Sequence, residues 1–496
     1  MIPALRNIPK SYSKAAASLL QPIYGRQTGG PQLPMCGPNL QSSFAISQGT
    51  DKCKTCTQTC TSGIRTITTN QTDEKPALAQ VESIEKSQME HFNLDTESLK
   101  KLNPSVSETI TVHPISAVDI DGTKIKLTLT NGETLRYPTV WLRDNCQCSN
   151  CFNPLALGRS FLMQNLLSAP EADDARLSDA GDVEIRWKDG HESVFKAEWL
   201  QRRAFTEQAR QKYRSRFSLP KKQWSHGHKV AEFDYPSLME DDAALLRWLV
   251  VLETWGATLL KQTPSQPSAA YDLCERVAKV KYTHYGIYSS VVNHPQANNL
   301  AYTNQTLNLH NDMPQYQEIP GLIFLHMVKQ HRGEGGDTII SDGLRAAEYM
   351  REHYPQQFET LVTTDVYFWD KGEGKDQMEM NQFYKINKGP TIQLNNSGEV
   401  STIRFNNQVR DSHLDLPDDK VEDFYHALQI YFRLMYDNSV SFKMQDGDMT
   451  VLDNVRCQHA RQSFEGDLTA RHLVTTFMSW DEALCRRRRL QEQFKL

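Results

Sequence analysis

Apolar and polar residues alternate along much of the chain from residue 109 onward, which predicts a fold built mainly of strands. Four early segments show this alternation: TITVHPISAV, TKIKLTLTNG, ETLRYPTVWL and DVEIRWKDGHESVF. Half-buried strands have this period of two, and the TNG and KDG tripeptides are typical turns between them. These segments predict a small β domain over residues 109–215, followed by the basic connector SLPKKQWSHGHK.

Residues 216–496 predict a second, larger domain in which strands alternate with a few helices. The strand-like segments are NNLAYTNQTLNLHND, GLIFLHMVKQ, GDTIISDG, STIRFNN, VSFKM, DMTVLDNVRCQHARQSF and RHLVTTFMSW. One helix is clear, because six apolar residues recur at helical spacing: Val421, Phe424, Tyr425, Leu428, Phe432 and Met435. Short strands with inserted helices predict a sandwich or barrel, closer to a jelly roll than to alternating βαβ units.

Residues 1–108 lack such periodicity and are predicted to be a presequence followed by a disordered linker. The first fifty residues contain no Asp or Glu but carry Arg6, Lys10, Lys14 and Arg26. This composition is typical of a mitochondrial presequence, the alternative being a cytoplasmic protein with a tail that happens to lack acids. The linker contains Cys53, Cys56 and Cys60; with no histidine or fourth cysteine nearby, we interpret them as part of an unstructured segment.

The charge of the chain argues against two classes of protein. The net charge of −5 gives no basic surface for nucleic acid. The longest apolar run, LLRWLVVLETWGATLL, is interrupted by Arg247 and Glu253 and is shorter than the roughly 20 apolar residues of a membrane span. We therefore expect neither a nucleic-acid partner nor a transmembrane helix.

A histidine and an aspartate lie two positions apart at the end of a predicted strand, in LNLHNDMPQ. Alternate residues of a strand share a face, so His310 and Asp312 could bind one metal ion from the same side. His459, in DNVRCQHARQSF, is the candidate third ligand. Two histidines and one carboxylate form the facial triad of non-haem iron, which leaves coordination positions open. Arg471 begins the next apolar strand, where a buried guanidinium requires a carboxylate from the protein or from a co-substrate.

These motifs belong to a longer series that resembles the γ-butyrobetaine dioxygenase and trimethyllysine dioxygenase family of carnitine biosynthesis. The series consists of VWLRDNCQCSNC, ANNLAYT, LNLHNDMP, PGLIFLHMVKQ, GGDTIISDG, RFNN, DGDMTVLDNVRCQHAR and RHL, in this order. The resemblance implies a double-stranded β-helix that binds iron through His310, Asp312 and His459. It also implies that 2-oxoglutarate chelates the iron and pairs its far carboxylate with Arg471, with Leu325 in the same pocket.

Three cysteines in a Cys-x-Cys-x2-Cys run and a later histidine suggest a second metal site, in the small β domain. Cys146, Cys148, Cys151 and His191 would give zinc a closed tetrahedral shell, which indicates a structural role. The resemblance points to the same four residues as a zinc site. Reduced cysteines buried in a core remain the alternative.

The resemblance also implies a substrate site with a cation cage and a pair of amides. Tyr285, Tyr302 and Phe477 match cage positions that hold a trimethylammonium group through cation–π attraction. The cage departs from the family where a tryptophan is usual, because the chain has Ser289 there. Asn299 and Asn406 match amides that hold the carboxylate of γ-butyrobetaine, whereas relatives that act on trimethyllysine carry Asp at the first position. Packing in the core is the alternative role of each aromatic residue.

The sequence thus predicts an Fe(II)- and 2-oxoglutarate-dependent hydroxylase of γ-butyrobetaine or a close betaine, using O2 and ascorbate as the reductant, with structural zinc. A trimethyllysine hydroxylase and a non-catalytic relative that acts as a binding module are the alternatives. A homodimer is left open. Asp342 and Asp453 are candidates either for orienting the ligand histidines or for capping turns.

Overall fold

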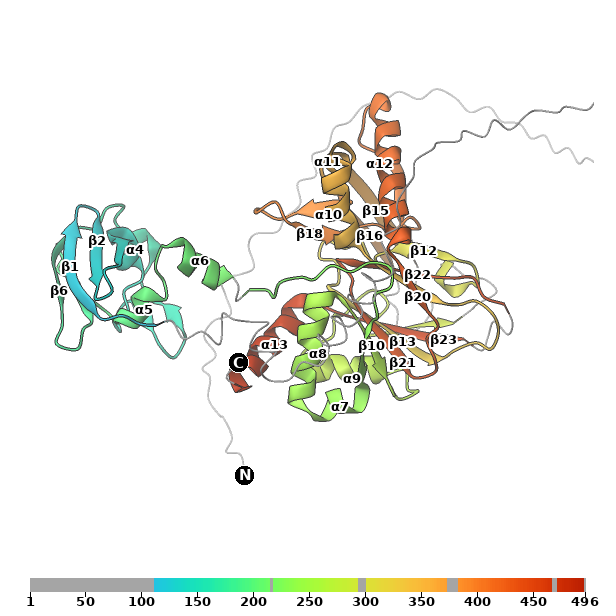
Figure 1. The fold of residues 1–496 in the computed structure, drawn as a ribbon, viewed down its shortest axis with the longest axis horizontal. Helices are drawn as coiled ribbons and strands as arrows, with labels where there is room; N and C mark the ends of the chain where they lie inside the picture. The colour runs from blue at the N-terminus through green and yellow to red at the C-terminus, as the bar shows by residue number, and fades with distance from the viewer. Residues whose placement is uncertain (1–110, 215–216, 293–299, 373–381, 466–470, 495–496) are drawn as a thin grey trace, which may run out of the picture. The chain divides into compact units, whose positions relative to one another are not determined.

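A computed structural model of the protein describes residues 111–214, 217–292, 300–372, 382–465 and 471–494 (Figure 1). The predicted presequence and linker, including Cys53, Cys56 and Cys60, lie outside these ranges. None of the helices within them is long and apolar enough to cross a bilayer.

The first described part, residues 111–214, contains two three-stranded antiparallel sheets. Its strands are β1 (Ile115–Asp121), β2 (Lys124–Leu129), β3 (Thr134–Pro138), β6 (Ala172–Leu177), β7 (Val183–Trp187) and β8 (Glu192–Phe195), with a short hairpin of β4 (Phe152–Asn153) and β5 (Gly158–Arg159). Alternate residues such as Ile125, Leu127 and Leu129 are buried, as the period of two requires. The two sheets share one apolar core, whose buried residues run from Ile115 to Ala204.

Short helices connect and follow these strands: α4 (Thr139–Asp144), the 3-10 helix η1 (Met163–Asn165), α5 (Ala197–Gln201) and α6 (Glu207–Arg214). The prediction of one strand over ETLRYPTVWL is wrong in its second half, where α4 lies. Pro138 has no N–H group to continue a ladder, so it ends β3 and precedes the first turn of α4.

The larger part contains a six-stranded sheet in the order β11-β23-β13-β21-β10-β9 and a four-stranded sheet in the order β12-β22-β14-β20. Among the strands that the structure describes, only β9 and β10 pair in parallel. The strands of the first sheet are β9 (Ala231–Asp234), β10 (Ala257–Lys261), β11 (Ser289–Val292), β13 (Leu322–Lys329), β21 (Asp448–Asp453) and β23 (His472–Met478). Those of the second are β12 (Leu307–His310), β14 (Thr338–Asp342), β20 (Val440–Phe442) and β22 (Cys457–Arg461).

Two groups of helices cover these sheets (Figure 1). The helices α7 (Tyr235–Glu240), α8 (Asp242–Trp255), α9 (Ala269–Val277) and α13 (Trp480–Phe494) pack with the six-stranded sheet. The helices α10 (Gly343–His353), α11 (Pro355–Thr363) and α12 (Asp418–Asp437) pack in a second core with the strands β15 (Asp365–Gly372), β16 (Phe383–Pro390), β17 (Ile392–Leu394), β18 (Val400–Ile403) and β19 (Arg410–Leu414). The mainly β architecture with inserted helices agrees with the prediction.

The helix predicted from Val421 to Met435 is α12, and the strands predicted over GLIFLHMVKQ, GDTIISDG and RHLVTTFMSW are β13, β14 and β23. The predicted strand over NNLAYTNQTLNLHND is shorter than expected, because its described residues include a 3-10 turn, η2 (Leu300–Tyr302), before β12. The apolar run starting at Leu245 is divided at Gly256, whose φ of +78° ends α8. A Cβ there would lie 2.9 Å from the Cys457 sulfur, so the close approach also requires glycine.

Candidate active site

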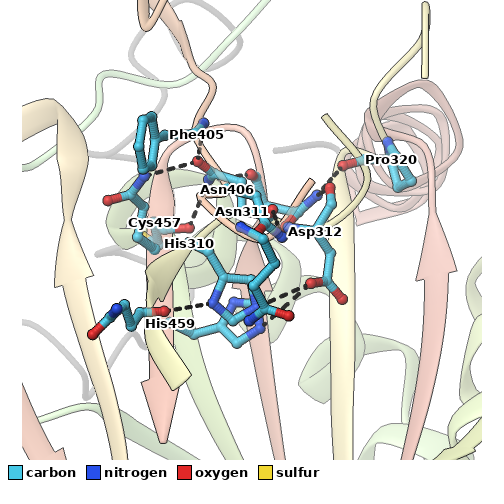
Figure 2. Close-up of polar contacts among 12 residues, drawn as sticks. His310, Asn311, Asp312, Pro320, Phe405, Asn406, Cys457 and His459 are labelled. Atoms are coloured by element: carbon cyan, nitrogen blue, oxygen red, sulfur yellow. Dashed lines mark hydrogen bonds and ion pairs between the residues drawn. The ribbon is translucent and has the colours of Figure 1, made fainter. Parts of the chain in front are cut away.

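His310, Asp312 and His459 come together at one edge of the four-stranded sheet. His310 is the last residue of β12 and lies directly across from His459 of β22, with the ring centroids 4.3 Å apart. The Asp312 Oδ1 atom is 3.3 Å from Nε2 of His310 and 3.8 Å from Nε2 of His459. Figure 2 shows the three side chains pointing toward one another. The donor atoms of all three lie within 4.8 Å of each other, as one metal ion requires.

The protonation of these groups suits a metal site. The Nδ1 atom of His310 is 2.7 Å from the Asn308 carbonyl oxygen. That carbonyl accepts a hydrogen bond from Nδ1–H, which leaves the lone pair of Nε2 free toward Asp312. Burial lowers the pKa of His459 to about 3, so its imidazole is neutral. Burial raises the pKa of Asp312, but the two imidazoles beside it outweigh this effect, so its pKa is lowered overall and the carboxylate is ionised.

Two buried asparagines fix the position of Asp312, which follows the end of β12. The Asn454 side chain accepts a hydrogen bond from the Asp312 N–H (2.9 Å) and donates to the Asp312 carbonyl (2.9 Å). Asn311 donates to the carbonyl oxygens of Asn454 (2.6 Å) and Cys457 (3.2 Å) (Figure 2). The prediction that His310 and Asp312 lie together is confirmed. The reason given for it is wrong, because β12 ends at His310 and Asp312 does not belong to the strand. The amide clamp orients the aspartate, and neither asparagine was singled out from the sequence.

A cavity of about 130 Å³ opens in front of the three side chains, between the two sheets. The four-stranded sheet contributes His310, His459 and Thr338, whereas the six-stranded sheet contributes Leu325, Thr475 and Phe477, among others. The other predicted site residues that line it are Tyr285, Tyr302, Asn406 and Arg471, together with Ser289. Asn299 lies outside the described residues.

Arg471 is a buried cation whose charge lacks an acidic partner among the described residues. Its exposed fraction is 5%, and burial, with the charge of Arg461 second, lowers its pKa to about 9. Its Nε atom has no hydrogen-bond partner in the described parts of the chain. A buried guanidinium in this state favours an anionic ligand with two oxygens, because its planar fork can bind a carboxylate at two points.

Comparisons with known proteins agree with this geometry. A family model described as "Taurine catabolism dioxygenase TauD, TfdA family" matches residues 218–477, and one described as "Gamma-butyrobetaine hydroxylase-like, N-terminal" matches residues 117–201. The gamma-butyrobetaine dioxygenase of Homo sapiens is 34% identical over 361 residues, which cover 72% of this chain and 92% of the relative. The chain belongs to the TauD, TfdA family.

Other relatives in this dioxygenase family carry two different names. The gamma-butyrobetaine dioxygenase of Pseudomonas sp. (strain AK-1) is 28% identical and covers 76% of this chain and 96% of its own length. The trimethyllysine dioxygenase of Meyerozyma guilliermondii is 25% identical and covers 75% of this chain and 95% of its own length. The chain is thus a dioxygenase of the 2-oxoglutarate-dependent class, and iron and 2-oxoglutarate fit its donor set and its buried arginine.

Two candidate residues of this dioxygenase do not contact the ligand histidines. Asp342 forms a fully buried ion pair with Arg456 (2.8 Å) and caps α10 by accepting from the Leu344 N–H. Asp453 accepts hydrogen bonds from the Trp480 indole N–H (3.0 Å) and from the Val455 N–H. Of the two roles that the sequence left open, capping is correct and orienting the histidines is wrong.

The four predicted zinc ligands also come together, within residues 146–191. The His191 Nε2 atom is 3.2 Å from the sulfur of Cys146 and 3.7 Å from the sulfurs of Cys148 and Cys151. A tetrahedral zinc ion would place sulfur and nitrogen about 3.5 Å apart, given bonds of about 2.3 and 2.0 Å. Burial, followed by the charge of Arg143, lowers the pKa of His191 and favours the neutral imidazole that a metal needs.

Asp370 lines the cavity and was not predicted from the sequence. It lies on β15, and its side chain is 25% exposed. Gln315 donates to its carboxylate at 3.5 Å and also lines the cavity. A sequence signal did exist, because Asp370 follows Val366 and Phe368 at the spacing of one strand face, and both of these are fully buried.

Proposed function

We propose that this dioxygenase hydroxylates γ-butyrobetaine, or a close trimethylammonium betaine, to carnitine or its analogue, while 2-oxoglutarate is converted to succinate and CO2. The proposal rests mainly on one observation. Three metal donors, which would leave coordination positions open, share a cavity with the buried Arg471, which has no acidic partner among the described residues. Such a site needs a metal and an anion together. The gamma-butyrobetaine dioxygenases among the relatives support the choice of substrate.

Different side chains of the cavity would bind the metal and the co-substrate. His310, Asp312 and His459 would hold Fe(II), which supplies the activation of O2 when it is bound. Arg471 would pair with the far carboxylate of 2-oxoglutarate, and Leu325, which lines the same cavity, would help to exclude water. Burial of this charged pair removes it from the screening effect of solvent, so the co-substrate is held in one orientation.

The aromatic residues would hold the trimethylammonium group. Tyr285, Tyr302 and Phe477 line the same cavity as the donor set, as cation–π binding near the metal requires. Ser289 also lines it, so a hydroxymethyl side chain stands where the family usually has an aromatic ring. Asn406 is an amide of the cavity, but it already donates to the Asn311 carbonyl (3.3 Å) and accepts from the Gln408 N–H. It would therefore bring at most one further N–H to a substrate carboxylate.

The cluster of Cys146, Cys148, Cys151 and His191 would hold a structural zinc ion. Four donors fill a tetrahedral shell and leave no position for a substrate, so its contribution is to folding. Ascorbate would serve as the reductant that keeps the active-site iron in the Fe(II) state. The zinc assignment rests on the geometry of the four donors, and the ascorbate assignment rests on the proposed class of enzyme.

A substrate panel tests the proposed function. The iron-loaded protein is incubated with 2-oxoglutarate, ascorbate and, one at a time, γ-butyrobetaine, trimethyllysine and related betaines, and products are identified by mass spectrometry. We expect a product 16 mass units heavier from γ-butyrobetaine, with succinate formed in equal amount. A hydroxylated product from trimethyllysine alone would assign the chain to the other reaction of this family.

A further inference from the structure

The cavity contains a half-buried carboxylate that the proposed roles do not use. Asp370 occupies the core-facing position of β15, two residues after the fully buried Phe368, where an apolar residue would extend the core. Its carboxylate instead lines the cavity that also contains Tyr285 and Phe477. Placing a carboxylate at such a position costs free energy unless the charge is paired or bound.

A histidine that is held by a tyrosine lies close to this carboxylate. The Tyr316 hydroxyl oxygen accepts a hydrogen bond from the His284 backbone N–H (3.0 Å), so its own proton is available for His284 Nδ1, 2.7 Å away. Nδ1 is then the acceptor, and the ring proton is on Nε2, which is 3.7 Å from the Asp370 carboxylate. Burial lowers the pKa of His284 to about 4, so the ring is neutral and does not cancel the charge of Asp370.

No Lys or Arg in the described residues forms an ion pair with Asp370. Lys385 lies opposite it in the register of β15 and β16, but the Lys385 ammonium is placed over the Tyr316 ring, 4.5 Å from the centroid. Burial raises the pKa of Asp370, with a weaker opposing effect from the Lys371 N–H. The carboxylate therefore lacks a counter-ion among the described side chains, as Arg471 does.

We propose that Asp370, which lies beside the neutral ring of His284, is the counter-charge for the cationic group of the substrate and makes the cavity select a betaine over a neutral molecule of the same shape. This inference rests on the proposed function and names the residue that determines its specificity. Aromatic faces attract a cation through their quadrupoles, but a formal negative charge adds a stronger and longer-ranged attraction. Since Ser289 replaces one aromatic face, the carboxylate supplies attraction that an incomplete cage lacks.

The arrangement also explains why a dipolar substrate would be oriented. Arg471 and Asp370 line one cavity without pairing with each other, so the cavity has sites for one anionic and one cationic group. Asp312 and Asp370 are the carboxylates among the described lining residues, and Asp312 belongs to the iron site, so the cation of a betaine would approach Asp370 and the aromatic rings. A betaine reversed end to end would bring its carboxylate against Asp370, which costs free energy.

The test compares a cation with its neutral isostere. The two ligands are γ-butyrobetaine and 5,5-dimethylhexanoate, in which carbon replaces the quaternary nitrogen. Their dissociation constants are measured by calorimetry on the protein loaded with Fe(II) and 2-oxoglutarate in the absence of oxygen. For Asp370→Asn we expect the constant for γ-butyrobetaine to rise about 10- to 100-fold, because a carboxylate facing a cation in a partly desolvated site is lost. The constant for 5,5-dimethylhexanoate should stay within about threefold, since no charge faces its tert-butyl group.

Three further variants control for the effects of folding. Asp365→Asn makes the same change on the same strand at a carboxylate that pairs with Lys388 (2.8 Å), and both constants should match those of the wild type. Asp370→Glu keeps the charge and should retain preference for the cation. Tyr316→Phe removes the hydroxyl that orients His284, so it should weaken γ-butyrobetaine binding less than Asp370→Asn does and leave 5,5-dimethylhexanoate unaffected.

Tetramethylammonium chloride separates this inference from the proposed function, because it carries the cation without the rest of the substrate. If the wild type turns over no γ-butyrobetaine yet binds tetramethylammonium in a manner that depends on Asp370, the proposed substrate is wrong and the inference stands. If the wild type turns over γ-butyrobetaine and Asp370→Asn binds both cations as tightly as the wild type, the inference is overturned. Equal loss of γ-butyrobetaine and 5,5-dimethylhexanoate in Asp370→Asn would overturn it as well, since it would show a change of shape rather than of charge.

Discussion

The described residues contain two clusters of side chains that could hold a metal ion, and these clusters differ in the number of donors and in the space in front of them. Cys146, Cys148, Cys151 and His191 supply four donors, whereas His310, Asp312 and His459 supply three. The described cavity lies in front of the second cluster, and none of its lining residues belongs to the first. Four donors complete a tetrahedral shell, but three leave positions open for ligands that react.

The two clusters also differ in how far apart their donors lie in the sequence. The three cysteines come from one short segment and the histidine from the β7–β8 hairpin, whereas the second cluster joins β12 to β22 across much of the larger part. A local cluster can be held by a small core that the metal itself stabilises. A reactive cluster needs a scaffold that stays rigid without the ligand, which here includes the amides of Asn311 and Asn454. The open position and the rigid support, rather than the metal ligands as such, indicate catalysis.

The largest predicted effect concerns the open cluster. Asp312→Ala removes one of its three donors, so Fe(II) binding should weaken and product formation should be abolished. Product is measured by mass spectrometry and iron by elemental analysis. His310→Ala and His459→Ala should behave alike, while zinc content remains that of the wild type. Near-normal hydroxylation by Asp312→Ala would show that the metal site has been wrongly assigned.

Arg471 allows co-substrate binding to be separated from metal binding. Arg471→Met should leave iron bound and raise the KM for 2-oxoglutarate by about 30-fold to several thousand-fold, since loss of one partner of a buried charged pair costs about 2–5 kcal/mol. Steady-state kinetics with varied 2-oxoglutarate checks this. Arg471→Lys should recover only part of the loss, because a point charge cannot replace the planar fork. An unchanged KM together with lower stability would make Arg471 a structural residue.

For the closed cluster we predict an effect on folding. Cys148→Ser should release zinc and lower the melting temperature of the protein, because binding energies of about 10–16 kcal/mol in small zinc domains exceed their net stability. Calorimetry and elemental analysis measure both quantities. Cys485→Ser, at an exposed position of α13, is the matched control and should change neither. A Cys148→Ser protein that melts like the wild type would contradict a structural role.

The smallest predicted effect concerns a histidine that belongs to neither cluster. His326 is fully buried on β13, neither ring nitrogen has a described hydrogen-bond partner, and burial lowers its pKa to about 4. The unfolded chain has the ordinary pKa of about 6.5 and binds the proton first, so stability falls as the pH decreases from about 6.5 to 4. His326→Met should remove roughly 2–3 kcal/mol of this pH dependence. Urea unfolding at several pH values measures it, with the exposed His413→Met as the control; equal slopes in wild type and His326→Met would disprove the effect.

Much of the fold could be predicted where one face of an element is buried and the other is not. The pattern of Val421 to Met435 predicted α12, and the apolar runs predicted β13 and β23. The pattern gave a wrong prediction where a single residue determines the backbone conformation. Pro138 is such a residue, because β3 ends there and α4 follows it. It also gave no prediction for β15 and β16, whose register depends on pairing with each other.

The site could be predicted where the chemistry needs a rare combination of residue types. His310, Asp312 and His459 are such a set, and the structure places them together. Asn454 and Asp370 were missed because an amide in a turn and a carboxylate on a strand are both common. Their roles depend on the positions of Asp312 and His284, which are distant from them in the sequence. The sequence indicated Asp453 instead of its neighbour Asn454, and only the hydrogen bonds distinguish the two.

The most direct test of the proposed hydroxylation traces both atoms of O2 into the products. The iron-loaded protein is given γ-butyrobetaine and 2-oxoglutarate under ¹⁸O2, and both products are analysed by mass spectrometry. We predict one ¹⁸O atom in the hydroxylated betaine, one in succinate, and equal amounts of the two products. Succinate formed at the same rate whether or not γ-butyrobetaine is present, with the betaine recovered unchanged, would contradict the proposal that this cavity hydroxylates it.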